Sequence, residues 1–179
     1  VFGTAPIAFA CPRTGKEPVV WDMSSSSMSF MEIEVASTKN EKIQPESAVD
    51  KNGNPTLDSV AAMDGGMLLP FAKHKGSAIA FMVELMAAGL TGGRFAFENS
   101  ISEDPGFAGA NRGQTIIAMD PKSLHGPGFI DRVDEFIDAY SESTAERVPG
   151  DGRLSRRLKA KTSGIEVDHD LLETVKSFL

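Results

Sequence analysis

The stretch "LLPFAKHKGSAIAFMVELMAAGLTGG" at residues 68–93 decides the fold, because it contains the longest nearly uncharged run of the chain. Residues 77–90 carry a single charged side chain, Glu84. A helix that is apolar on all sides is typical of a protein core, so we expect a long buried central helix that begins near Lys75. A lone carboxylate in such a helix needs a hydrogen-bond partner, and we expect a structural partner for Glu84 rather than a role as a catalytic acid.

The start of this helix is cationic and flexible. A helix N-terminus carries about half a positive charge, Lys75 adds a full charge there, and Gly76 would let a ligand approach the backbone closely. Free N–H groups beside such charge bind anions. The pattern therefore indicates a site for a phosphate or carboxylate, with an ordinary solvated lysine as the alternative.

The composition limits the kinds of partner. The chain has 179 residues, enough for one sizeable core and a small second subdomain, and its formal net charge is -7. An acidic chain without a basic run is a poor binder of nucleic acid. Residues 77–90 are shorter than the roughly 20 apolar residues that span a bilayer. We expect neither nucleic acid nor a membrane as a partner.

Cysteine and histidine usage bears on compartment and metal chemistry. The single cysteine, Cys11, forms no internal disulfide, which favours a reducing compartment and a cytoplasmic location. Cys11 lies in the apolar segment "IAFACP", where a buried residue is the more common role than a nucleophile. His74, His125 and His169 lack metal-ligand spacing, so we expect no metal.

Short apolar strands and helices mix along the rest of the chain. The expected strands cover 4–12, 18–23 and 114–121, and the expected helices cover 27–40, 128–143, 154–161 and 169–179. Asp168 is expected to cap the last helix rather than to chelate a metal. The polar, glycine-rich residues 98–112 indicate a loop. The fold class is therefore α/β or α+β, with flanking helices around the central one.

Familiar nucleotide-binding and nucleophile motifs are absent from the sequence. No Gly-x-Gly-x-x-Gly follows a strand, and neither a P-loop nor a Gly-x-Ser-x-Gly elbow occurs. Residues 50–58 superficially resemble a calcium loop, but Pro55 and Ala61 stand where that loop needs glycine and glutamate, so we expect an ordinary turn. Asp22 ends a strand and could accept hydrogen bonds from ribose hydroxyls or cap a helix.

Six segments, in this order, resemble the C-terminal half of the type 2 malate/L-lactate dehydrogenase family, which includes ureidoglycolate, sulfolactate, diketogulonate and piperideine-carboxylate enzymes. The segments are "FGTAPIAFACP", "VVWDMSSS", "DKNGNPTLD", "GGMLLPFAKHKGSAIAFMVELMAAGLTGG", "MDP" and "RVPGD". The resemblance implies a non-Rossmann dinucleotide-binding domain with a mixed or antiparallel sheet. It also implies an oxidoreductase, typically a homodimer, that moves a hydride between NAD or NADP and a small 2-hydroxy or 2-oxo acid.

By motif, the family's cofactor contacts fall on several positions of this sequence. The residues that the resemblance assigns to cofactor binding are Asp22, Met23, Ser24, Lys75, Pro149, Gly150, Asp151, Thr4 and Pro6. Two of the departures from the family pattern touch this set: Ala5 stands where the family has asparagine, and Asp151 where it has glutamate.

The sequence leaves the choice between NAD and NADP open. The 2′-phosphate of NADP needs a cationic partner. Such a partner could be supplied, if the fold brings it close, by Arg13, Lys16, Arg153 or Arg156.

The resemblance further implies a division of the chain and an incomplete active site. Residues 1–147 would be the C-terminal part of the cofactor-binding domain, and 148–179 a helical segment that would pack on a missing N-terminal domain. The family's proton-transferring histidine and substrate-binding arginine belong to that N-terminal segment. We therefore expect no catalytic residue here and a C-terminal fragment that is inactive alone. The alternatives are a non-catalytic or degenerate dinucleotide-binding module and an unrelated protein that binds phosphoanions.

Overall fold

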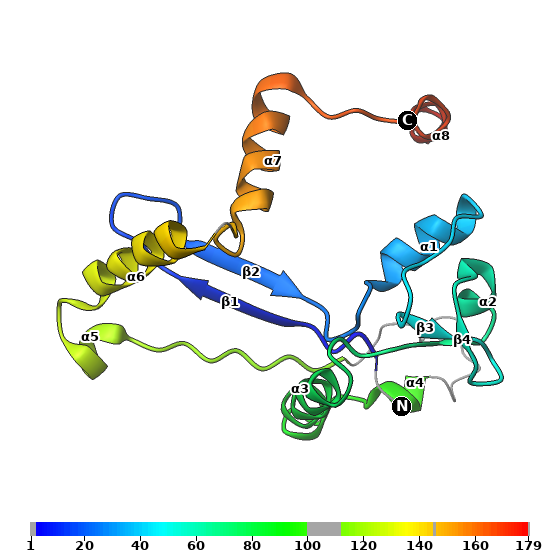
Figure 1. Ribbon diagram of the computed structural model, residues 1–179, viewed down its shortest axis with the longest axis horizontal. Helices are drawn as coiled ribbons and strands as arrows, with labels where there is room; N and C mark the ends of the chain where they lie inside the picture. Colours follow the sequence, from blue (N-terminus) through cyan, green and yellow to red (C-terminus); the bar gives the residue numbers. More distant parts are fainter. Residues whose placement is uncertain (1–2, 100–111, 145, 179) are drawn as a thin grey trace. The chain divides into compact units, whose positions relative to one another are not determined.

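The structure is a computed structural model that describes residues 3–99, 112–144 and 146–178 (Figure 1). Its contacts divide the chain into two compact units, the first formed by Val1–Ala8 and Asp22–Asp120 and the second by Phe9–Trp21 and Pro121–Leu179. Helices and short strands mix, and the strands pair in small sheets. The predicted mixed class is confirmed.

The two predicted N-terminal strands form a hairpin. β1 (Ile7–Cys11) and β2 (Val19–Met23) pair in a two-stranded sheet and run in opposite directions (Figure 1). The rings of Phe9 and Trp21 stack with their centroids 5.8 Å apart. Cys11 is buried, as predicted, and burial raises the pKa of its thiol. The hairpin tip, from Phe9 to Trp21, belongs to the second unit.

α1 (Phe30–Thr38) lies within the helix predicted at 27–40 and begins with a capping box. The Glu32 backbone N–H donates to the Ser29 hydroxyl at 3.2 Å, and the Ser29 N–H donates back to the Glu32 carboxylate at 2.7 Å. This reciprocal pair satisfies two of the donors that every helix start leaves free. The cap directs Ile33 and Ala36 inward, where both are buried.

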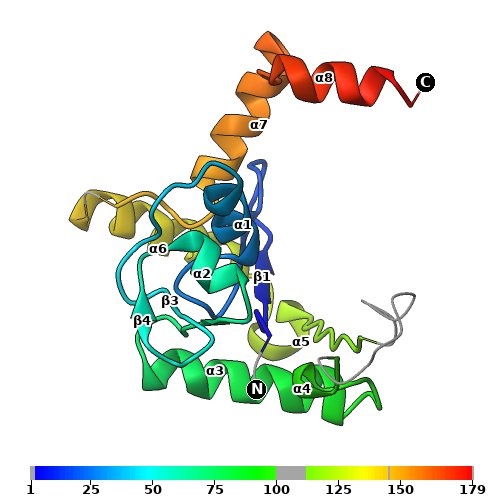
Figure 2. The same ribbon diagram turned by 90° about the vertical axis from the view of Figure 1, so that its right-hand side faces the viewer.

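The core of the first unit lies between two helices and a small sheet. β3 (Ala48–Val49) pairs antiparallel with β4 (Pro55–Thr56) on one side and with β5 (Met67–Leu68) on the other. α2 (Ser59–Met63) packs against α1 (Figure 2). The buried cluster comprises Ile33, Ala36, Ile43, Ala48 and Ala62. Between β3 and β4, the Asp50 carboxylate accepts the backbone N–H groups of Asn52 and Asn54 at 2.8 and 2.9 Å, which confirms the predicted turn.

The central helix lies where the sequence predicts it, but the expected burial is wrong for the described chain. α3 (His74–Glu84) continues into a π-helical turn, η1 (Leu85–Gly89). Only small residues of these elements are buried, namely Gly76, Ala80 and Ala88. Large apolar side chains are about half exposed, with 57% for Phe81 and 50% for Leu85. The small residues lie where these elements pack closely, and the large apolar side chains stay exposed.

Residues 114–121, predicted as a strand, join no sheet among the described residues. The segment up to Asp120 is extended, and Ile116 and Ile117 are exposed. It is tied instead to the preceding helix, since the Thr115 hydroxyl donates to the Met86 carbonyl at 2.6 Å. The apolar pattern was correct for an extended segment, but a strand also needs a neighbour to pair with.

Helices dominate the rest of the chain. α4 (Ala96–Asn99) takes the first two residues of the segment predicted as a loop at 98–112, most of which lies outside the described residues. The second unit contains α5 (Pro121–His125), α6 (Phe129–Ser143), α7 (Asp151–Ser163) and α8 (His169–Lys176). Asp168 caps α8 as predicted, accepting the Asp170 N–H at 2.9 Å. Within the ranges described, no helix has the length and apolarity needed to cross a membrane.

Candidate functional site

The predicted cofactor residues divide between the two units. The first unit holds Thr4, Pro6, Asp22, Met23, Ser24 and Lys75, and the second holds Pro149, Gly150 and Asp151.

In the first unit, the serine-rich loop after β2 joins two predicted segments. The Ser25 backbone N–H and hydroxyl both donate to the Thr4 carbonyl, at 2.9 and 3.2 Å. The Ser25 carbonyl in turn accepts the Phe71 N–H at 3.0 Å. Ser24 is held by the hydroxyl of Ser26, which donates to it at 2.8 Å. Thr4, Ser24 and the loop that leads to Lys75 therefore lie side by side.

Alanine at position 5 adopts a strained backbone. The φ angle of Ala5 is 37°, in the left-handed region, and the residue is buried. The left-handed backbone costs alanine about 1–2 kcal/mol. Asparagine, which stands at this position in the family that the sequence resembles, tolerates this conformation better.

At the start of α3, the backbone N–H groups of Lys75 and Gly76, which were predicted to be free for an anion, are bonded within the chain. The N–H groups of Lys75 and Gly76 donate to the carbonyls of Ala72 and Phe71, at 3.2 and 3.1 Å. Gly76 is buried, and a Cβ there would collide with the Phe71 carbonyl oxygen. Glycine is thus needed for the approach of Phe71 rather than of a ligand. What remains for an anion is the ammonium of Lys75, an exposed residue.

The carboxylate in the apolar helix has the structural partner that we expected. One oxygen of Glu84 accepts the backbone N–H of Ala96 at 3.0 Å. It therefore holds the start of α4 against the end of α3. No group of three side chains suited to a metal ion occurs in the parts of the chain that the structure describes.

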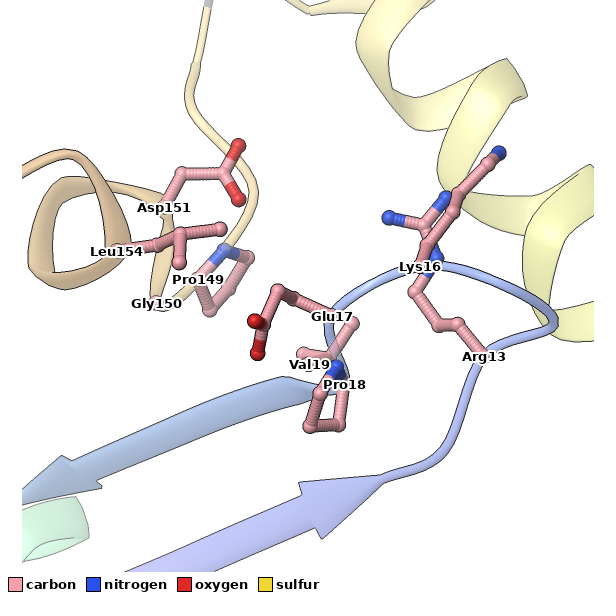
Figure 3. Close-up of a pocket in the computed structure, with 9 residues that line it drawn as sticks. All are labelled: Arg13, Lys16, Glu17, Pro18, Val19, Pro149, Gly150, Asp151 and Leu154. Atoms are coloured by element: carbon pink, nitrogen blue, oxygen red, sulfur yellow. The ribbon is translucent and has the colours of Figure 1, made fainter. Parts of the chain in front are cut away.

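In the second unit, the late turn forms one wall of a pocket of about 190 Å³ (Figure 3). The other wall is the turn of the β1–β2 hairpin and the start of β2. The lining residues are Arg13, Lys16, Glu17, Pro18 and Val19 from the hairpin, and Pro149, Gly150, Asp151 and Leu154 from the turn and α7. The pocket thus brings Pro149, Gly150 and Asp151 together with Arg13 and Lys16, two of the four cations considered for a 2′-phosphate.

Gly150 fixes this turn against the hairpin. Its φ angle is 99°, which favours glycine, and a Cβ would collide with the Val20 carbonyl oxygen. The same residue is the N-cap of α7, and its carbonyl accepts the Leu154 N–H at 3.1 Å. One glycine therefore both begins the helix and allows β2 to approach the turn.

Both positively and negatively charged side chains lie around the pocket. The Arg13 Nε donates to the Asp134 carboxylate of α6 at 2.6 Å, and the Lys16 ammonium lies 3.8 Å from the same oxygen. The hydrogen bond from Arg13 is the largest cause that lowers the pKa of Asp134. Arg13 is well covered, with 15% of its side chain exposed. Two carboxylates, Glu17 and Asp151, complete the lining.

Sequence reasoning missed two of these charged residues. Asp134 lies on α6, and its pairing with Arg13 spans 121 residues. No local spacing reports such a contact. Glu17 could have been found, because it follows Lys16 directly in a turn whose position was predicted.

The chain is similar to known proteins along nearly its whole length. The family model for malate/L-lactate dehydrogenase matches residues 1–176. The chain is 40% identical to a Δ(1)-pyrroline-2-carboxylate/Δ(1)-piperideine-2-carboxylate reductase of Pseudomonas syringae pv. tomato, over 98% of this chain and 51% of that protein. It is 33% identical to a (2R)-3-sulfolactate dehydrogenase (NADP(+)) of Chromohalobacter salexigens, over 99% and 53%.

A solved structure shows the same fold. The crystal structure of Δ1-piperideine-2-carboxylate reductase from Pseudomonas syringae pv. tomato superposes with a TM-score of 0.86 and 39% identity, covering 100% of this chain and 54% of that one. The chain thus spans about half the length of the curated relatives it matches.

Proposed function

The chain belongs to the malate/L-lactate dehydrogenase family, and from this membership we propose that it is the cofactor-binding part of an NAD(P)-dependent oxidoreductase. The observation that carries the proposal is the family match over residues 1–176. The bound nicotinamide would supply or accept a hydride at C2 of a small 2-oxo or 2-hydroxy acid. The chain's own residues would bind and orient the dinucleotide.

The pocket of the second unit suits the adenosine end of such a cofactor. Asp151 offers a carboxylate that can accept a ribose hydroxyl, and Arg13 and Lys16 offer donors. The proline-glycine turn presents backbone to the pocket without a bulky side chain. In the first unit, Thr4, Ser24 and Lys75 are the proposed contacts of the remaining groups, with Pro6, Asp22 and Met23 beside them in sequence.

A cyclic imino acid is a second candidate substrate. The relative at 40% identity is named as a reductase of pyrroline- and piperideine-2-carboxylate. A cyclic 2-imino acid and a 2-oxo acid both present an electrophilic C2 beside a carboxylate, so the same hydride transfer serves both. The alternative of a degenerate binding module receives no support from these relatives.

Three further features remain proposals. We propose a homodimer in the cytoplasm, following the resemblance. We also propose that 148–179 packs on a domain that precedes this segment in the relatives, because α8 leaves Leu171 and Val175 about half exposed. Residues 1–179 by themselves would bind cofactor without turnover, since a proton donor near the substrate oxygen is expected in that preceding domain. Robust turnover of a 2-oxo acid by the 179-residue chain would contradict this last proposal.

Binding of the dinucleotide tests the function directly. Energy transfer from the only tryptophan, Trp21, to reduced nicotinamide gives a signal that needs no substrate. We expect the double variant Asp22→Ala, Lys75→Ala to lose binding of both NADH and NADPH. The matched control is Lys51→Ala, Asp64→Ala, which removes an exposed pair 3.2 Å apart in the same unit. Equal binding by both double variants would contradict the assignment.

A further inference from the structure

We infer that the pocket of the second unit selects NADP(H) over NAD(H), with Arg13 and Lys16 contacting the 2′-phosphate of the adenosine ribose. This inference rests on the proposed function, because it assigns the adenosine end of the cofactor to this pocket. It goes further by naming the cofactor and the side chains that recognise it.

Arg13 is positioned as a phosphate-binding arginine. Its Nε donates to Asp134 at 2.6 Å, which uses one of the five guanidinium N–H groups and fixes the plane of the rest. The side chain lines the pocket and is only 15% exposed, so it is already ordered before a ligand arrives. A rigid, planar fork of donors matches a phosphate better than a mobile chain does. Asp134 is thus a positioning residue.

Lys16 adds a second cation to the same wall. Its ammonium lies 3.8 Å from Asp134 and is about half exposed, so it can turn toward a ligand. Asp134 balances one of the two positive charges and Glu17 on the same wall offsets the other, so recognition of a phosphate depends on direct contact with Arg13 and Lys16 rather than on the net charge of the wall. A phosphate ester carries a charge of about -1.5 to -2 at neutral pH, whereas the 2′-hydroxyl of NAD has no charge for this wall to recognise.

The opposite wall suits the rest of the ribose. Figure 3 shows the Asp151 carboxylate across the pocket from the ends of Arg13 and Lys16. A 2′-phosphoribose carries an anion at one carbon and a hydroxyl donor at the next. The two walls match that pair, because the hydroxyl can donate to Asp151 while the phosphate lies against Arg13.

Glu17 works against the phosphate and provides an independent test. Its carboxylate also lines the pocket and would repel the 2′-phosphate. Because the residue is exposed, the repulsion is screened. Glu17→Gln should therefore tighten NADPH binding about two- to fivefold and leave NADH binding unchanged.

The decisive measurement is the ratio of dissociation constants for NADH and NADPH, followed through Trp21. A hydrogen bond to a charged group corresponds to a change of about 10- to 100-fold, so Arg13→Ala should weaken NADPH by that factor and NADH by less than about threefold. Lys16→Ala should weaken NADPH by a smaller factor in the same direction. Because Arg13→Ala could also unfold the hairpin, Lys16→Ala at an exposed position keeps the test valid. Arg157→Ala, on α7 away from the pocket lining, is the matched control.

Ligands that lack the nicotinamide test whether the preference for NADPH arises at the adenosine end. Isothermal titration should show adenosine 2′,5′-bisphosphate binding the wild-type protein at least tenfold more tightly than adenosine 5′-monophosphate, with the difference reduced in both variants. The inference is overturned if NADH and NADPH bind the wild type equally well, or if neither variant changes their ratio. Failure of the wild type to bind either dinucleotide would overturn the proposed function as well.

Discussion

Replacement of Gly150 by alanine tests whether the late turn must touch the hairpin. The residue has a φ angle of 99°, and an added Cβ would collide with the Val20 carbonyl oxygen. A left-handed backbone costs alanine about 1–2 kcal/mol, and overpacking costs about 1–3 kcal/mol more. We therefore expect Gly150→Ala to lower the free energy of unfolding by about 2–5 kcal/mol, a large share of the roughly 5–15 kcal/mol typical of folded proteins.

Urea unfolding followed by the fluorescence of Trp21, the neighbour of Val20, measures this loss. Gly152→Ala is the matched control two residues on, where a Cβ would meet only the flexible end of Arg156 at 3.5 Å. Since Gly152 lies within α7, alanine there should raise stability by about 0.5–1 kcal/mol. The reasoning is refuted if Gly150→Ala unfolds at the wild-type urea concentration, or if both variants lose the same stability.

Three other changes have definite expected results. Gly76→Ala should destabilise the protein by about 1–3 kcal/mol, because its Cβ would strike the Phe71 carbonyl; unchanged thermal unfolding would contradict this. The hydrogen bond from the Ser29 backbone lowers the pKa of Glu32, so its stabilising effect is full above the ordinary pKa of 4.5 and is lost as pH falls through the lower folded value. Glu32→Gln should therefore be less stable than wild type at pH 7 and no different at pH 2, as urea titrations at both pH values would show. Burial raises the pKa of the Cys11 thiol, so iodoacetamide at pH 8 should label it only after unfolding, and rapid labelling of the native protein would count against that burial.

Local signals accounted for the elements that the sequence predicted well. Prolines bound the first strand, and the helix predicted over 27–40 contains α1, which begins three residues later than predicted. The burial of α3 was not predictable in this way, because burial depends on what other segments place against a helix. The exposed Phe81 and the segment 114–120, which joins no sheet among the described residues, are the two results of that dependence.

In the candidate site too, single residues could be named from the sequence, whereas contacts between segments far apart in the chain could not. The family resemblance assigned Pro149 and Gly150 to the cofactor, and the cations of the hairpin turn could be named as possible partners of a 2′-phosphate. Their meeting in one pocket could not be predicted, since residues from about 13 to 19 join residues from about 149 to 154. The positive φ angle of Ala5 was equally hidden, because alanine gives no sign of a left-handed backbone.

The split of the second unit along the chain bears on how the protein is made. Arg13 is synthesised 121 residues before Asp134. At roughly 5–20 residues per second, the hairpin tip waits about 6–24 s for its partner helix. During that interval the hydrogen bond between Arg13 and Asp134 cannot form, so the hairpin tip lacks the helix that holds it. A chaperone that shields residues 7–23 until α6 leaves the ribosome would raise the yield of folded protein more than one that acts on the later helices.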